Sequence, residues 1–154
     1  MFAPPSSSMP RALSAEQRAR LVRTAREVSF PQGARLFEEG GRADRFWVIR
    51  TGSVDLGMRV PGRRAAVIER LGHNEPVGWS WLFSPYVRHL GAEAATPVRA
   101  YEFDAAAVHA LCQDDPGFAR DLTRWAGNVV ARRLHAARVG LLDLYGPYGA
   151  GSAR

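Results

Sequence analysis

The sequence predicts an α+β fold that is mainly β, with one helix before the β region and two helices after it. Between Ser29 and Asp104, short apolar runs alternate with glycine turns, a pattern typical of a sandwich, a barrel or a jelly roll. A capped amphipathic segment precedes this region, and a long periodic segment follows it. The chain has 154 residues, of which 46% are hydrophobic, so one domain can bury a core of its own.

The first element is predicted to be a helix over Ala15–Glu27. Ser14 is a good N-cap, and Gln17 three residues later completes a capping box. The apolar stripe of this segment consists of Leu21, Val22, Ala25 and Val28. Residues 1–13 are rich in Pro and Ser and are expected to form a disordered tail, so the domain is expected to cover 14–145.

The β region contains recognisable strands and turns. Val54, Leu56 and Met58 alternate with polar or small residues, which predicts a half-buried strand. Pro61-Gly62 is a turn signal between this strand and a second one over 65–71. The run Phe46-Trp47-Val48-Ile49 is apolar on both faces and is expected to lie in the core. The other turn signals are Gly33, Gly40, Gly41, Gly52, Gly72 and Gly78.

Two helices are predicted after the β region. A short one covers Ala105–Gln113, with Asp104 as its cap. A long one covers 116–145: it opens on a proline, Asp114 or Asp115 can cap it, and a Gly-Pro pair is expected to end it.

The long helix carries two apolar stripes. The first consists of Phe118, Leu122, Trp125 and Val129. The second has coiled-coil-like spacing and consists of Gly127, Val130, Leu134, Ala137, Leu141 and Leu144. One stripe can pack on the β region while the other faces a second subunit, which predicts a homodimer. The alternative is that both stripes are buried within one chain.

The net charge of +6 comes from arginine alone, because the chain contains no lysine. The arginines are scattered from Arg11 to Arg154, whereas a nucleic-acid surface needs its charge gathered on one face. After the long helix only 146–154 remain, which we expect to be a flexible tail without a helix-turn-helix domain. We therefore expect no direct specific DNA binding.

Two further features bear on location. Cys112 is the only cysteine, which fits a reducing cytoplasm, and no signal peptide is apparent. No apolar run is long enough to span a bilayer, so we expect no membrane association.

The sequence offers no catalytic or metal site. The four histidines lie outside any metal-binding spacing, so no metal and no cofactor are expected. Without lysine there can be no Walker motif, and no Gly-x-Ser-x-Gly elbow occurs. Cys112 has acidic neighbours, which should raise the pKa of its thiol. We therefore expect that the protein is not an enzyme.

The segment from Gly78 to Arg88 is the strongest candidate for a binding site. A glycine turn with inward N–H groups and a nearby guanidinium can hold an anion. The alternative is a hydrophobic turn followed by an ordinary surface arginine.

The order of these motifs resembles a known family. The pattern Phe30-Pro31-x-Gly33-x-x-Leu36-x-x-x-Gly40 continues as Asp44-x-Phe46-Trp47-x-Ile49-x-x-Gly52-x-Val54, and Glu75-Pro76-Val77-Gly78 follows. With the 78–88 spacing and the long helix, the chain resembles a stand-alone cyclic-nucleotide-binding-like domain of the Crp/Fnr regulator superfamily over about 15–145.

The resemblance implies a double-stranded β-helix, or jelly roll, with a long C-terminal dimerisation helix. It implies a phosphate-binding cassette formed by Gly78, Trp79, Ser80, Trp81, Leu82, Arg88 and His89. It also implies a dimer interface formed by Val130, Leu134, Ala137, Leu141 and Leu144.

The cassette departs from the family pattern at two places. The glutamate that holds the ribose in cyclic-nucleotide binders is replaced by Trp79, which cannot accept a hydrogen bond. The residues after Arg88 are His89 and Leu90 instead of Ser or Thr followed by Ala. Cyclic AMP and cyclic GMP are therefore expected to bind weakly.

Three functions remain open on the sequence. The first is a non-catalytic regulatory module that binds a small anionic ligand and signals through its dimerisation helix. The second is a ligand-free interaction or scaffold module that works through a protein partner. The third is a transcriptional co-regulator that depends on a DNA-binding partner.

Overall fold

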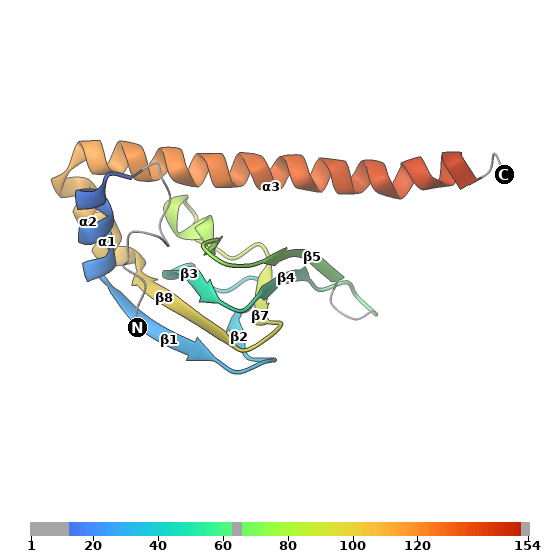
Figure 1. Cartoon of the computed structure of the whole chain (residues 1–154), viewed down its shortest axis with the longest axis horizontal. Coiled ribbons are helices and arrows are strands. Elements are labelled where there is room, and N and C mark those ends of the chain that lie inside the picture. Colours follow the sequence, from blue (N-terminus) through green and yellow to red (C-terminus); the bar gives the residue numbers. More distant parts are fainter. Residues whose placement is uncertain (1–12, 63–65, 152–154) are drawn as a thin grey trace.

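The computed structural model describes residues 13–62 and 66–151, with side chains described up to residue 143. Figure 1 shows two sheets that form a β-roll beneath a long helix. The first sheet has the order β1 (Ala25–Phe30), β8 (Val98–Asp104), β3 (Arg45–Thr51), β6 (Pro76–Val77). The second has the order β2 (Arg35–Phe37), β7 (Gly91–Ala94), β4 (Val54–Met58), β5 (Ala66–Leu71). All neighbouring strands in both sheets are antiparallel.

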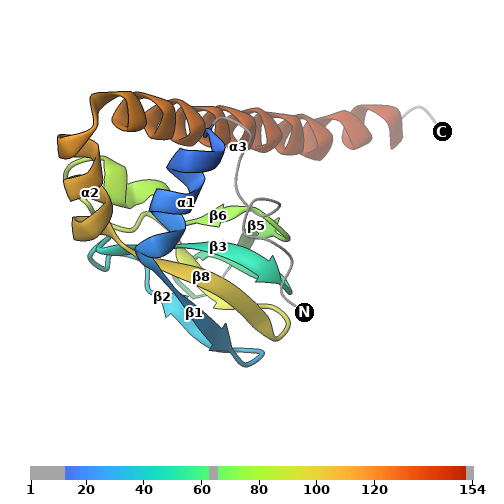
Figure 2. The same ribbon diagram turned by 60° about the vertical axis from the view of Figure 1, so that its left-hand side comes forward.

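Helices cover one side of the roll. These are α1 (Ala15–Arg23), α2 (Ala105–Asp114) and α3 (Pro116–Gly151). Figure 2 shows α1 and α2 together beneath the start of α3. A short 3₁₀ helix, η2 (Trp79–Leu82), follows β6. The predicted α+β jelly-roll class is confirmed. Among the described residues, no helix combines the length and apolar character needed to cross a bilayer.

Strand β3 divides the core in two. Phe46 and Val48 belong to a cluster between the first sheet and the helices, whereas Trp47 and Ile49 belong to a cluster between the two sheets. Successive side chains of a strand point to opposite faces, so one strand serves both clusters. This confirms the prediction that this run lies in the core.

Three predicted boundaries are wrong. The capping box of Ser14 forms, but α1 ends at Arg23, because Ala25–Phe30 pairs with β8 as strand β1. Leu13, expected in the disordered tail, is buried in the cluster beneath the helices. Helix α3 continues through the Gly-Pro pair to Gly151. The rest of the predicted N-terminal tail, 1–12, and the last residues, 152–154, lie outside the described residues.

The cap of α3 is Asp115, one of the two predicted candidates. Its carboxylate accepts a hydrogen bond from the backbone N–H of Phe118 at 3.1 Å. This contact and Arg20 hold the pKa of Asp115 below its usual value. Asp104 is in the N-cap position of α2, but its side chain makes no capping hydrogen bond.

Candidate ligand-binding site

Gly78 and Arg88 meet inside the roll. Gly78 has φ +87°, a conformation that glycine adopts without strain. A Cβ at this position would overlap with Nη1 of Arg88 and lie 3.2 Å from its Cζ. Any larger residue at position 78 would therefore displace the guanidinium, which explains why the turn requires glycine.

Arg88 is a buried cation. It is 2% exposed, so the alternative of an ordinary surface arginine is wrong. Its Cζ lies 4.2 Å from the ring centre of Phe37 and 5.7 Å from that of Trp47. Burial lowers its pKa to about 10, against a smaller opposing effect of Asp44.

The hydrogen bonds of Arg88 are incomplete. Nη2 donates to the backbone carbonyl of Arg45. Nε and Nη1 are buried and have no hydrogen-bond partner among the described residues. A buried guanidinium with unsatisfied N–H groups is unfavourable unless an anion or another acceptor joins it.

A small cavity adjoins this guanidinium. Its volume is about 70 Å³, whereas sites for drug-sized ligands measure about 300–1,000 Å³. It is lined by Phe37, Leu56, Gly78, Trp79, Ser80, Arg88, His89, Leu90 and Arg133.

Five of the predicted cassette residues therefore line the same cavity, and two do not. Trp81 packs in the cluster beneath the helices, where it stacks on Phe46 at 4.4 Å between ring centres. Leu82 packs against that same cluster. In a 3₁₀ helix successive side chains are rotated by about 120°, so adjacent residues of η2 face different sides.

Trp79 forms one wall of the cavity. Its ring centre lies 5.8 Å from that of Phe83 and 6.4 Å from that of His89. The indole is half-buried, and its only polar group is a donor. This wall can pack against a ligand but cannot accept a hydrogen bond from a sugar hydroxyl.

Arg133 is a lining residue that the sequence analysis missed. It lies on α3, and its Nη2 donates to the backbone carbonyl of Pro76. Its Nε lies 3.8 Å from the carboxylate of Glu69, and its side chain is 12% exposed. Burial lowers its pKa, while Glu69 and Glu75 act in the opposite direction. The available signal was its spacing, because it continues the roll-facing stripe four residues after Val129.

The two stripes of α3 have different surroundings. Phe118, Leu122, Trp125 and Val129 are buried in the cluster beneath the helices. Leu134 is 51% exposed and Leu141 is 56% exposed, so the alternative that both stripes are buried within one chain is wrong. Of the other predicted interface residues, Val130 is half-buried, Ala137 is exposed, and the side chain of Leu144 lies outside the described residues.

Strand β5 also carries exposed apolar side chains. Val67 and Ile68 of β5 are 59% and 54% exposed. The contact between Arg133 and Glu69 places β5 next to α3, and Figure 1 shows the β4–β5 hairpin running below the distal part of the helix. Exposed apolar residues therefore occur on both β5 and the distal part of α3.

The sequence matches one protein family model and curated transcriptional regulators. Residues 27–115 match the family model of the cyclic nucleotide-binding domain. The chain is 33% identical over 126 residues to a CRP-like cAMP-activated global transcriptional regulator of Mycobacterium tuberculosis. That match covers 82% of this chain and 54% of the relative, so the chain spans about half the length of the curated relatives it matches.

Solved structures show the same architecture. The N-terminal domain of a transcriptional regulator from Streptomyces coelicolor is similar with a TM-score of 0.67 and 32% identity, covering 81% of this chain and 86% of that one. A cyclic nucleotide-binding domain from Methylobacillus flagellatus has a TM-score of 0.78 and 18% identity, covering 85% and 74%. The second likeness concerns the fold alone.

Proposed function

The chain belongs to the cyclic nucleotide-binding domain family, and we propose that it is a non-catalytic regulatory module that binds a compact anion beside Arg88. The predicted resemblance to this family is confirmed. The observation that carries the proposal is the pair of unsatisfied, buried N–H groups of Arg88 next to a cavity. An anion there would supply both the missing acceptors and the missing negative charge.

The nature of the ligand follows from the lining of the cavity. Arg88 and Arg133 both contribute positive charge, and Trp79 occupies the wall where a ribose acceptor would be needed. A volume of about 70 Å³ accommodates a phosphate or carboxylate group but not a nucleoside. We therefore propose a compact anion as the ligand and weak binding of cyclic AMP. The relative from Mycobacterium tuberculosis is described as cAMP-activated, and that description applies to the relative.

Signalling would use α3. Arg133 belongs to this helix and lines the cavity, so a bound anion would attract it away from its present partners, Glu69 and Pro76. The helix would then be stabilised in one position relative to the roll. A homodimer through Val130, Leu134, Ala137, Leu141 and Leu144 would transmit that position to a second subunit.

The ligand-free interaction module remains the second candidate. It is favoured by the small volume of the cavity and by the presence of Trp79 in its wall. In this case the exposed faces of α3 and β5 would bind a protein partner constitutively, with no dependence on a small molecule.

Action on DNA is a separate question. The curated relatives are transcriptional regulators of which the match covers only 54%, so the comparisons do not support the expectation that the protein acts without binding DNA. Location in the cytoplasm stays a prediction.

Isothermal titration calorimetry of the unmutated protein with inorganic phosphate and with cyclic AMP tests the proposal. We expect saturable binding of phosphate and much weaker binding of cyclic AMP. Tight binding of cyclic AMP would contradict the role given to Trp79. Absence of binding for both compounds would favour the ligand-free module.

A further inference from the structure

Glu102 is a buried carboxylate inside the roll. It lies on β8, and Val98 and Ala100 on the same face of this strand pack in the cluster between the two sheets. Glu102 is 7% exposed, so a charged side chain occupies a position that is otherwise apolar. Burying a carboxylate is unfavourable unless it is paired and hydrogen-bonded, and an apolar residue would fill this position at lower cost.

The partners of this carboxylate are of two kinds. Oε2 accepts a hydrogen bond from the indole Nε1 of Trp47 at 3.0 Å, and this contact is buried. Oε1 accepts from Nε of Arg26 at 2.8 Å and from Nη1 of Arg45 at 3.4 Å. The side chains of Arg26 and Arg45 are 67% and 51% exposed, so water screens these two ion pairs. The bond to the indole is therefore the contact of Glu102 that fixes geometry inside the roll.

The indole of Trp47 connects Glu102 to the anion site. Trp47 stacks on Phe37 at 5.7 Å between ring centres, and the Cζ of Arg88 lies 4.2 Å and 5.7 Å from the ring centres of Phe37 and Trp47. The two rings form an aromatic surface beside the guanidinium, and such surfaces attract cations. Among the described residues, Arg88 donates a hydrogen bond to the carbonyl of Arg45, while its Nε and Nη1 are unpartnered. The direction of these two groups therefore depends on the rings.

We propose that Glu102 is a positioning residue of the anion site. By holding the indole of Trp47 in place, it fixes the direction in which Arg88 presents its free N–H groups to the cavity. Its effect on binding rests on the proposed function of Arg88. Glu102 itself does not line the cavity, so it acts through Trp47. The indole N–H needs an acceptor at position 102, which an uncharged amide also supplies.

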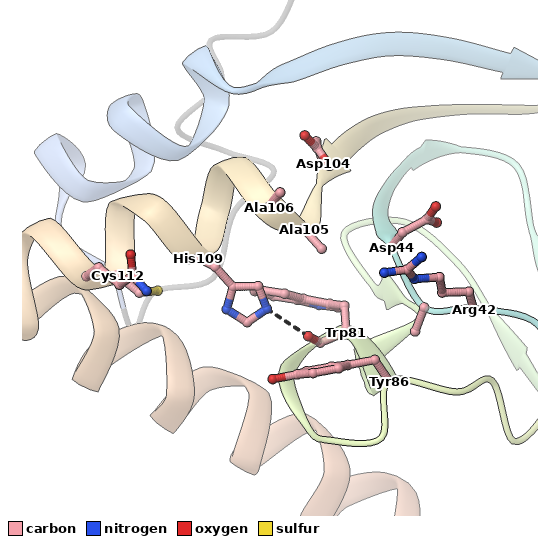
Figure 3. A pocket seen from close by; sticks show the side chains of 11 residues that line it. Arg42, Asp44, Trp81, Tyr86, Asp104, Ala105, Ala106, His109 and Cys112 are labelled. Atoms are coloured by element: carbon pink, nitrogen blue, oxygen red, sulfur yellow. Dashed lines mark hydrogen bonds between the residues drawn. The ribbon is translucent and has the colours of Figure 1, made fainter.

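A separate contact holds η2 and provides a control. Figure 3 shows His109 of α2 directed at the backbone carbonyl of Trp81, and the Nε2 of His109 lies 3.0 Å from that oxygen. Neither His109 nor Trp81 lines the cavity beside Arg88. His109→Leu therefore removes a hydrogen bond to η2 without touching the guanidinium or the two rings beside it.

Heteronuclear NMR of the labelled full chain, without any ligand, tests the position of Arg88. The Nε–H resonance of Arg88 and the indole N–H resonance of Trp47 are assigned from Arg88→Gln and Trp47→Phe. In Glu102→Leu we expect both groups to exchange with solvent at least about tenfold faster, because the indole loses its acceptor and releases the ring. Glu102→Gln keeps an acceptor, so both rates should stay within about threefold of those in the unmutated protein.

Calorimetric titration with inorganic phosphate measures the consequence for binding. Glu102→Leu should weaken binding at least about tenfold, the loss typical of one charge-assisted hydrogen bond, and Glu102→Gln should restore most of it. Arg26→Gln removes an exposed partner of the carboxylate and should change the affinity less than about twofold, as should His109→Leu. Thermal melting confirms that each variant is folded. Trp47→Phe removes the same hydrogen bond from its other end and replaces Glu102→Leu if that variant does not fold.

The outcomes separate the positioning role from the anion site. Unchanged exchange of the Arg88 Nε–H in folded Glu102→Leu, or in Trp47→Phe as its replacement, would overturn the positioning role. Faster exchange in Glu102→Gln that equals that in Glu102→Leu would overturn it too, because charge would then matter instead of an acceptor. Equally fast exchange in His109→Leu would show that any loosening of the core releases Arg88. The expected exchange pattern without phosphate binding would support the positioning role and contradict the proposed function alone.

Discussion

The two halves of α3 follow the same apolar periodicity but differ in what covers them. In the first half, Phe118 and Leu122 are fully buried against the roll and α2. In the second half, Leu134 and Leu141 are more than half exposed, and Figure 1 shows the helix projecting beyond the roll. Periodicity therefore predicts that a face is apolar, and the surroundings decide whether that face is covered within the chain.

The change from one half to the other occurs near Arg133. Arg133 continues the roll-facing stripe, yet it is a cation that lines the cavity of Arg88. Arg133 therefore lies where the buried and the exposed halves of α3 meet. Through this residue, a ligand bound in the cavity could affect the exposed half of the helix. The following variants probe this division.

The largest effect is expected from truncating the buried half. Leu122→Ala should lower the free energy of unfolding by about 2–5 kcal/mol, because it leaves a cavity in the core. Leu142→Ala, on the exposed half of the same helix, should change it by less than about 0.5 kcal/mol. Urea denaturation measures both. Equal losses would show that the two halves do not differ in burial in solution.

The exposed half of α3 should control formation of the homodimer. Burying a leucine contributes about 1.5–3 kcal/mol, so Leu134→Asp should convert a homodimer into a folded monomer. Val139→Asp places the same charge outside the predicted seam and should leave the dimer intact. Light scattering coupled to size-exclusion chromatography gives the mass of each. A monomeric unmutated protein at tens of micromolar would contradict the seam.

The sequence predicted the features that depend on local chemistry. The capping box at Ser14, the two-faced strand around Trp47 and the pairing of Gly78 with Arg88 each follow from a short motif or spacing. The features it did not predict depend on distant parts of the chain. The strand Ala25–Phe30 requires β8 as its partner, and Leu13 is ordered by the core beneath the helices.

The composition of the candidate site also depends on how distant elements pack together. The spacing of Arg133 places it on the roll-facing side of α3, but its contacts with Glu69 and Pro76 require α3 to be packed against β5 and β6. The separation of Trp81 from Trp79 depends on the 3₁₀ geometry of η2, whereas the sequence alone predicts only a turn there. Distances along the chain predicted which residues could meet, but the packing of the elements selected those that do.

Replacing the indole should change the ligand preference. Trp79→Glu supplies the missing acceptor, and a hydrogen bond to a buried polar group accounts for about 1–3 kcal/mol, so the affinity for cyclic AMP should rise about fivefold to 150-fold. Trp79→Leu is the control, which reduces the side chain without adding a hydrogen-bond acceptor. Calorimetry with cyclic AMP compares them. An unchanged affinity in both variants would show that Trp79 does not limit nucleotide binding.

A smaller effect is expected from the residue at the boundary. Arg133→Gln should weaken phosphate binding about tenfold, equivalent to about 1.4 kcal/mol, because it removes the second positive charge of the cavity. Arg132→Gln changes the exposed neighbour on the same helix and should have little effect. Equal affinities for phosphate in the two variants would remove α3 from the ligand site.

The central claim is that Arg88 holds a compact anion inside the roll. Phosphate titration of Arg88→Gln by calorimetry tests it most directly, with Arg124→Gln as an exposed control of the same chemistry. We predict at least about a hundredfold loss for Arg88→Gln, since charged hydrogen bonds contribute about 1.5–3 kcal/mol each, and no loss for Arg124→Gln. Phosphate binding that is equally strong in both folded variants would contradict the account.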